Sequence, residues 1–400
     1  MMGATRRIDR ESHAAPERAR RLLQLALGAL WILDGALQLQ PYMLSRAFAD
    51  HILEPAAAES PGWVSGPVLY FAHLVGAHPV LFDVPFGAIQ LAIGAGLLLR
   101  RTVRAALIAT ILWALVVWLL GEGLGGVLSP AASPFTGAPG AAVLYALLAL
   151  LAWPLKRQPT GAGARRSGGP GAWLPTRSAA TTGLLGDWAG AAWLALWGSA
   201  SWLALQGGFG SLGIAQSGVF ESAREAARAP ALAHWAGAVA YAQARGTGEP
   251  RFVAAIARFW ASTSATDASA IALAFAVVFA LAAIAIFLPA GAARVLLALS
   301  IAAAAAIWVL GESFGQILSG QGTDPNTGPL LILIALAFWP LRSLREAEAS
   351  AEPGAVRAAV GALPRLCRRP FAALPCEYQR KEVVQTLVDS HCGTLEVSGR

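Results

Sequence analysis

The sequence predicts an all-α, polytopic membrane protein with eight transmembrane helices, arranged as two parallel-repeat four-helix units. Hydrophobic residues make up 56% of the 400 residues and charged residues 13%, whereas about 25% charged is usual in soluble domains. Several apolar stretches approach the length of about 20 residues that a helix needs to cross a bilayer. A long motif also occurs twice, which indicates a duplicated structural unit.

The duplicated motif joins one apolar run to a second one. Trp118–Ser129 reads WLLGEGLGGVLS, and Trp308–Ser319, 190 positions later, reads WVLGESFGQILS. Each copy leads to a Thr-Gly turn and then to an apolar run that ends in Trp-Pro-Leu and a basic residue, at Trp153–Lys156 and Trp339–Arg342. The same order of motifs in both copies predicts two units of one architecture.

Polar segments between the apolar runs divide the chain into five parts. They are a leader (1–21), a first four-span unit (22–155), a Gly/Pro/Arg linker (156–187), a second four-span unit (188–342) and a C-terminal tail (343–400). We expect spans at 22–39, 84–99, 105–121, 139–155, 188–206, 268–288, 295–311 and 329–341. Prolines and histidines interrupt the apolar stretch 64–81, so we expect it to lie at the membrane interface.

The basic residues predict the orientation. Short connections rich in Arg or Lys, such as Arg100–Arg104 and the linker, all fall on one side of the arrangement, and the positive-inside rule assigns that side to the cytoplasm. Both termini are therefore expected to be cytoplasmic. The net charge of +7 follows these connections, so the expected partner is the lipid bilayer and not nucleic acid. Arg far outnumbers Lys, which with abundant Ala and Gly indicates a GC-rich bacterial genome and hence a bacterial plasma membrane.

Two glutamates hold the same place in the two copies of the motif. Glu122 and Glu312 lie where the third and seventh expected spans meet the outer interface. A carboxylate at that depth should face the bundle or water. It would then bind a cation, relay protons or contact a polar headgroup; the alternative is a solvated helix-end carboxylate. We expect the two glutamates to line one outward-facing site.

Three further residues are candidates for ligand or ion binding. Asp34 lies inside the first expected span and has no acidic counterpart at Ala200; it is either functional or a protonated acid bonded to a neighbouring helix. His73 and His234 occur in the similar stretches AHLVGA and AHWAGA. Two such histidines would flank a metal, a haem or a quinone headgroup, unless they are wet interfacial rings without a ligand.

Other motifs predict no chemistry. The tail contains Cys367, Cys376, His391 and Cys392 without paired Cys-x-x-Cys spacing, so we predict reduced thiols and no metal site. No phosphate loop and no common hydrolase motif is present, which argues against ATP-driven and hydrolytic chemistry. Ser133–Gly137 and Asp324–Gly328 precede apolar runs and suit helix caps.

Residues 84–107, VPFGAIQLAIGAGLLLRRTVRAAL, resemble the junction of the second and third spans in DoxX-type membrane proteins. The resemblance extends over about residues 20–155 and more faintly over the second half, and Gln90 stands where the family has an acid. The whole chain is similar to tandem actinobacterial membrane proteins with the same Gly-Glu and Asp-Pro-Asn-Thr-Gly stretches. The resemblance implies a four-span unit and a link to quinone or thiol redox chemistry.

The sequence leaves three functional hypotheses open. The first is a redox accessory that binds a quinone-like or other lipophilic ligand near the outer face, with a redox partner protein and with quinone or haem as the cofactor. The second is a transporter or channel for a small solute or ion, with its path between the two units. The third is a structural or assembly partner without a ligand. Whether the protein is an enzyme stays open.

Overall fold

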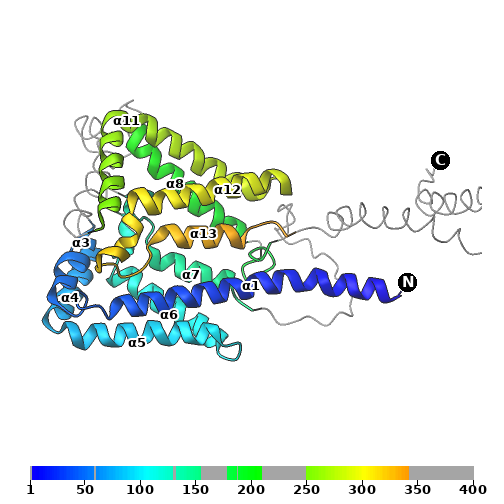
Figure 1. The fold of residues 1–400 in the computed structure, drawn as a ribbon, viewed down its shortest axis with the longest axis horizontal. Coiled ribbons are helices and arrows are strands. Elements are labelled where there is room, and N and C mark those ends of the chain that lie inside the picture. The colour runs from blue at the N-terminus through cyan, green and yellow to red at the C-terminus, as the bar shows by residue number, and fades with distance from the viewer. Residues whose placement is uncertain are drawn as a thin grey trace, which may run out of the picture. The chain divides into compact units, whose positions relative to one another are not determined.

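The computed structural model describes residues 2–57, 60–128, 132–154, 178–186, 188–209 and 249–341, and Figure 1 shows their arrangement. The described residues form helices and turns without a strand, so the prediction of an all-α fold is confirmed. Four helices are long and apolar enough to cross a membrane: Pro79–Leu98, Val103–Leu120, Ala270–Phe287 and Ala290–Gly311. This composition fits a helical membrane protein. Most of the expected linker, the whole tail and His234 lie outside the described residues.

The first half of the chain (residues 2–154) begins with α1, Met2–Gln38, a single helix that contains both the polar leader and the first expected span. The next elements are α2 (Arg46–Phe48), the π-helical turn η1 (Ala49–Leu53), α3 (Glu54–Ala56) and α4 (Gly62–Ala77). They are followed by α5 (Pro79–Leu98), α6 (Val103–Leu120), the turns η2 (Gly123–Gly126) and η3 (Pro134–Thr136), and α7 (Ala141–Leu151).

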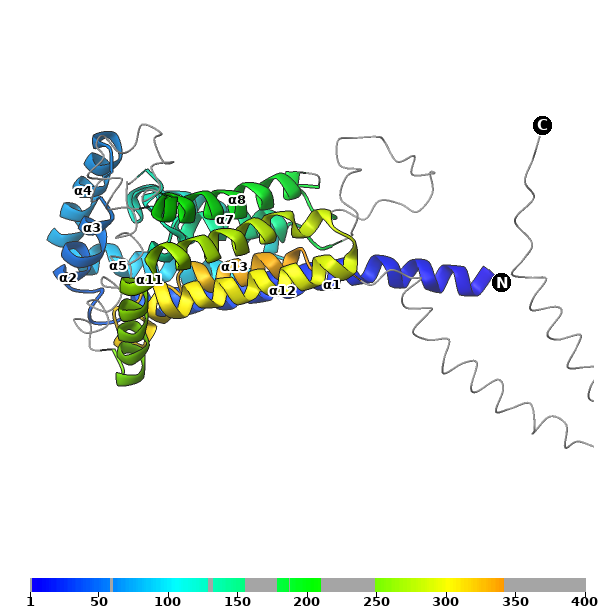
Figure 2. The ribbon, with the colours of Figure 1, turned by 90° about the horizontal axis from the view of Figure 1, so that it is seen from above.

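The described elements of the second half (residues 178–186, 188–209 and 249–341) are α8 (Trp188–Phe209), α11 (Arg251–Ile284), η5 (Ala285–Phe287), α12 (Ala290–Ala306), η6 (Ile307–Gly311), η7 (Ser313–Ser319) and α13 (Thr327–Ala337). The first part of α11 lies at the same end of the bundle as α2, α3 and α4, away from the N-terminus (Figures 1 and 2).

The stretch expected at the interface is a helix, α4, which crosses one end of the bundle (Figure 2). The expectation was wrong about where this stretch ends. His78 leaves the helical conformation (φ −141°, ψ 60°), and Pro79 begins α5. Proline suits the first position of a helix because its missing N–H would have no partner there. Residues 79–81 therefore belong to the second apolar helix.

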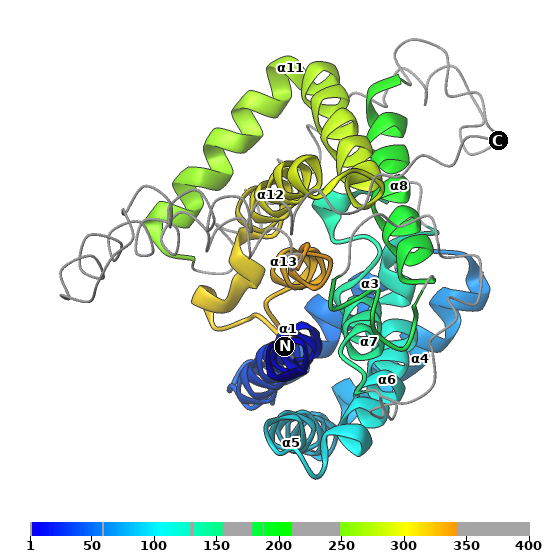
Figure 3. The ribbon, with the colours of Figure 1, turned by 90° about the vertical axis from the view of Figure 1, so that its right-hand side faces the viewer.

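The helices α7 and α13 are shorter than the spans expected at 139–155 and 329–341. Each has 11 residues, which makes a helix about 16 Å long, about half the thickness of a bilayer core. Most of their residues are buried, and the view along the bundle places both helices among the longer ones (Figure 3). A helix that is apolar all round belongs in such a buried position.

The longer helices pack in corresponding pairs in the two halves. In the first half α1 packs on α5 and α6 on α7; in the second half α8 packs on α11 and α12 on α13. The two halves meet where α13 contacts α7 and α1, and where η3 contacts η6 and α8.

Glycines bring α1 and α5 together. A Cβ on Gly35 would lie 2.9 Å from the carbonyl oxygen of Gly87, and one on Gly94 would lie 2.8 Å from that of Gly28. Small residues of this kind let two helix backbones approach closely. The close contact brings Asp34 and Gln90 to the wall of one cavity.

Candidate functional site

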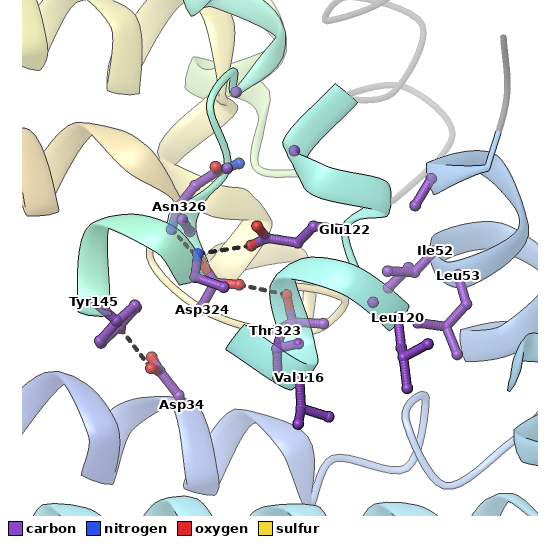
Figure 4. Close-up of a pocket in the computed structure, with 18 of the residues that line it drawn as sticks. Asp34, Ile52, Leu53, Val116, Leu120, Glu122, Tyr145, Thr323, Asp324 and Asn326 are labelled. Carbon is purple, nitrogen blue, oxygen red and sulfur yellow. Dashed lines mark hydrogen bonds between the residues drawn. The ribbon is translucent and has the colours of Figure 1, made fainter. Parts of the chain in front are cut away.

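A cavity of about 580 Å³ lies mainly in the first half, between α1, α5, α6, α7 and the short helices at the bundle end, and the loop before α13 completes its wall. Figure 4 shows part of its wall. Its polar lining residues are Asp34, Gln38, Gln90, Glu122, Tyr145, Thr323, Asp324 and Asn326. Its aromatic lining includes Trp31, Phe48, Phe71, Phe86 and Trp113. Both the volume and this make-up are usual for small-molecule sites.

Glu122 lies just after the end of α6, and its side chain contacts the start of α7. Its Oε1 accepts a hydrogen bond from the backbone N–H of Ala142 at 3.0 Å, where the helix dipole favours negative charge. Gly140 has a φ of +100°, and a Cβ there would lie 2.2 Å from Glu122 Oε2, so only glycine leaves room for the carboxyl group. Oε2 is buried and has no hydrogen-bond partner in the described part of the chain. Burial, and then the charge of Asp324, raise the pKa of Glu122 to about 8.

Glu312 has the same relation to α13, but both of its oxygens are used. Oε1 accepts from the backbone N–H of Thr327 at 3.1 Å and from the Thr327 hydroxyl, and Oε2 accepts from the N–H of Gly328 at 3.0 Å. The residue is 6% exposed. Burial raises the pKa of Glu312 to about 7, against the lowering effect of these donors.

The recurrence of the two glutamates therefore has a local physical reason. Each carboxyl group binds the N-terminus of the short helix that follows it, and neither is the solvated helix-end group considered as the alternative. They differ in their relation to the cavity, since Glu122 lines it and Glu312 does not. That both act in one outward-facing site stays a prediction.

Asp34 lies in the same wall as Glu122. Its Oδ2 accepts a hydrogen bond from the Tyr145 hydroxyl at 2.5 Å (Figure 4), and the ring of Tyr145 lies 4.5 Å from that of Trp31. Asp34 is 1% exposed, and its Oδ1 is without a partner among the residues that the structure describes. The tertiary structure thus brings together two acids that are 88 positions apart in the sequence.

Asp324 is a cavity residue that sequence analysis missed. It belongs to the loop before α13, and its carboxyl oxygens accept from the N–H of Asn326 at 2.6 Å and the hydroxyl of Thr323 at 2.8 Å. Burial raises the pKa of Asp324 above its ordinary value. The predicted cap is confirmed at Asn326, whose side chain accepts from the N–H of Thr327 at 2.9 Å. One signal was available: the first copy of this motif has Ser133 at the corresponding position, so the acid occurs in only one copy.

In each half, the loop before the short helix contacts the other half, but the two loops contribute different side chains. Asp324 and Asn326 of the second half line the cavity of the first half. In return, Phe135 of η3 packs into the second half, where its ring lies 5.5 Å from that of Trp260 and 4.6 Å from that of Phe275. The exchange therefore delivers an acid and an amide to the first half and an aromatic ring to the second.

His73 lies on α4 and takes no part in the cavity. Its side chain is 72% exposed, and its Nε2 lies 3.8 Å from Glu54 Oε1. No histidine is among the described residues that line the cavity, so these residues offer haem iron no axial histidine. The described residues also include no group of three or more His, Cys, Asp or Glu side chains placed to hold a metal ion.

The fold and the cavity define the class of protein: a helical protein with four apolar helices of membrane-spanning length and a largely apolar cavity in its first half. Comparison of the chain with protein-family models, with curated proteins and with solved structures found no match. The resemblance to DoxX-type proteins therefore stays a prediction.

Proposed function

We propose that this protein is an integral membrane protein that binds a lipophilic small molecule in the cavity of its first half. The observation that carries the proposal is the wall of the cavity, which is mainly apolar and aromatic but contains a few buried polar atoms without partners in the described chain. The apolar surface would supply most of the affinity, and the polar atoms would orient the ligand.

Exposed apolar residues beside the cavity support a lipophilic ligand. Val116 of α6 lines the cavity and is also 45% exposed. Leu112, Leu115 and Leu119 of the same helix are exposed as well. On a helix that crosses a membrane, such an apolar face contacts lipid. A ligand dissolved in the bilayer would then enter beside Val116 without passing through water.

A larger side chain that fills the cavity should displace the ligand. We expect Val117→Phe, which adds a ring inside the cavity, to reduce the amount of co-purified lipophilic ligand by about tenfold, since overpacking a site costs about 1–3 kcal/mol. The measurement is native mass spectrometry with extraction of the protein purified in mild detergent. Leu119→Phe is the matched control, because Leu119 is on the same helix, is 40% exposed and does not line the cavity. Equal occupancy in both variants would overturn the proposal.

A quinone-like ligand with a redox role is one alternative within this proposal. The indole N–H groups of Trp31 and Trp113 belong to cavity-lining residues and have no partner in the described chain. They are the kind of donor that quinone carbonyl oxygens require. The absorption spectrum of the purified protein would reveal a bound quinone or haem.

A transporter is the second candidate, and the loop exchange favours it. The cavity is completed by Thr323, Asp324 and Asn326 of the second half, so a movement between the halves would open or close the site. Solute flux into liposomes that contain the protein distinguishes transport from simple binding.

We propose further that the chain has eight membrane-embedded helices in two four-helix units, in a bacterial plasma membrane. The corresponding helix pairs and the capping of α7 and α13 by corresponding glutamates support two units. In each unit the short helix and the loop before it would complete the last crossing together, because irregular backbone is tolerated at membrane depth where protein buries it.

Reporter fusions test this topology. Fusions after Leu155 and after Arg342 should both report the cytoplasm, whereas a fusion after Gly320, in the loop before α13, should report the outside. The physical reason is the side on which the basic connections lie. An outside signal at Leu155 or Arg342 would contradict the arrangement.

A further inference from the structure

The charge of the cavity wall suggests the chemical class of its ligand. Three carboxyl groups line the cavity, those of Asp34, Glu122 and Asp324, and its described lining contains no Lys, Arg or His. A buried carboxylate without a cationic partner is costly. A positively charged ligand group would remove this cost.

The unpaired atoms of the wall add an independent constraint. Asp34 Oδ1, Glu122 Oε2 and Gln90 Oε1 are all buried acceptors without a partner in the described residues. Asp34 is 1% exposed and Gln90 8% exposed, so water at the surface does not satisfy them. Buried polar atoms normally have hydrogen-bond partners. The Gln90 oxygen therefore calls for a ligand that brings a donor, and so do the two acids when they are ionised; a quinone brings none.

The aromatic side chains fit the same kind of ligand. Trp31 lies against Tyr145, which is bonded to Asp34. The rings of Phe86 and Trp113, which also line the cavity, have centroids 5.4 Å apart. Aromatic faces attract organic cations and also provide apolar surface for the rest of the ligand. The indole N–H groups would accommodate an additional hydroxyl or carbonyl oxygen.

An inorganic cation fits less well. A metal ion needs several oxygen or nitrogen ligands within coordination distance, and the described residues include no suitably placed group of three. The volume of the cavity, about 580 Å³, also suits a molecule rather than an ion.

We infer that the cavity binds an amphipathic organic cation, with a protonated amine between Asp34, Glu122 and the Gln90 amide oxygen and an apolar body against the aromatic wall. This inference rests on the proposed function, because it names the class of lipophilic ligand that the same cavity takes.

Three probes of similar shape test the inference. The full-length protein in lipid nanodiscs is titrated with naphthylethylammonium, naphthylethanol and naphthylacetate, with tryptophan fluorescence or calorimetry as the readout. We expect the ammonium probe to bind at least about tenfold more tightly than the alcohol, and the anion to bind most weakly, because a buried ion pair discriminates strongly by charge. Empty nanodiscs correct for partition into lipid.

Two variants assign the effect to the cavity. Asp34→Asn should weaken binding of the ammonium probe by about tenfold and that of the alcohol by less than about twofold. Gln90→Glu, which adds an acid to the same wall, should strengthen binding of the ammonium probe even if Asp34→Asn fails to fold. Asp50→Asn is the control, since Asp50 pairs with Arg46 and does not line the cavity.

The outcomes separate the two proposals. Equal affinity for ammonium and alcohol, with both reduced by Val117→Phe, would overturn the cationic ligand and leave the lipophilic site standing. An unchanged affinity for the ammonium probe in Gln90→Glu would also overturn the inference. Failure of all three probes, with no co-purified ligand that Val117→Phe removes, would overturn both proposals.

Discussion

Glu312→Gln is expected to lower the free energy of unfolding by about 2 kcal/mol at neutral pH, whereas Glu122→Gln should not lower it. Both oxygens of Glu312 accept hydrogen bonds, from Thr327 and from the N–H of Gly328. An amide has only one acceptor oxygen, so its NH₂ group would face a buried N–H donor. Glu122 uses only Oε1, and the amide oxygen of Gln can take over that bond.

The measurement is unfolding of the purified protein in detergent, by heat or denaturant, followed by tryptophan fluorescence. Glu54→Gln serves as the control, because Glu54 lies at the bundle end with its side chain 37% exposed. Similar losses of stability in Glu312→Gln and Glu122→Gln would show that the two carboxyl groups do not differ in the way their hydrogen bonds indicate.

The stability of the protein should fall as the pH rises from about 4.5 to about 8, and Glu122→Gln should reduce this fall. Burial raises the pKa of Glu122 from 4.5 to about 8, so the folded state holds the proton more strongly than the unfolded state. The stabilisation is therefore complete below about pH 4.5 and is lost as the pH passes the folded-state pKa. The pKa difference sets an upper limit on the order of 4 kcal/mol, and the effect is smaller because Glu122 is only half-buried and water screens its charge.

Unfolding midpoints of the wild type and of Glu122→Gln between pH 4.5 and pH 9 provide the measurement. The variant should retain part of the pH dependence of the wild type, because the pKa values of Glu312 and Asp324 are also raised. Parallel profiles for the two proteins would mean that Glu122 has no share in the pH dependence.

The sequence by itself determined the class of the fold and identified several of the buried acidic residues. Apolar runs of spanning length predicted helices that the structure contains as α5, α6, α12 and the later part of α11. The repeated motif singled out Glu122 and Glu312, and the position of Asp34 within an apolar run marked it as a polar group in a buried place. These features are readable because helical periodicity and hydropathy are local properties of the chain.

Tertiary structure alone decided how these residues are combined. Hydropathy does not distinguish a spanning helix from a short one buried by its neighbours, so the length of α7 and α13 could not be predicted. The capping of each short helix by a glutamate depends on how the loop between them closes, and Asp324 joins the cavity only because a loop of the second half reaches into the first. His73 lies outside because it is on the exposed face of α4, whereas Phe71 of the same helix lines the cavity. Such contacts between distant residues follow from packing, which local sequence patterns do not record.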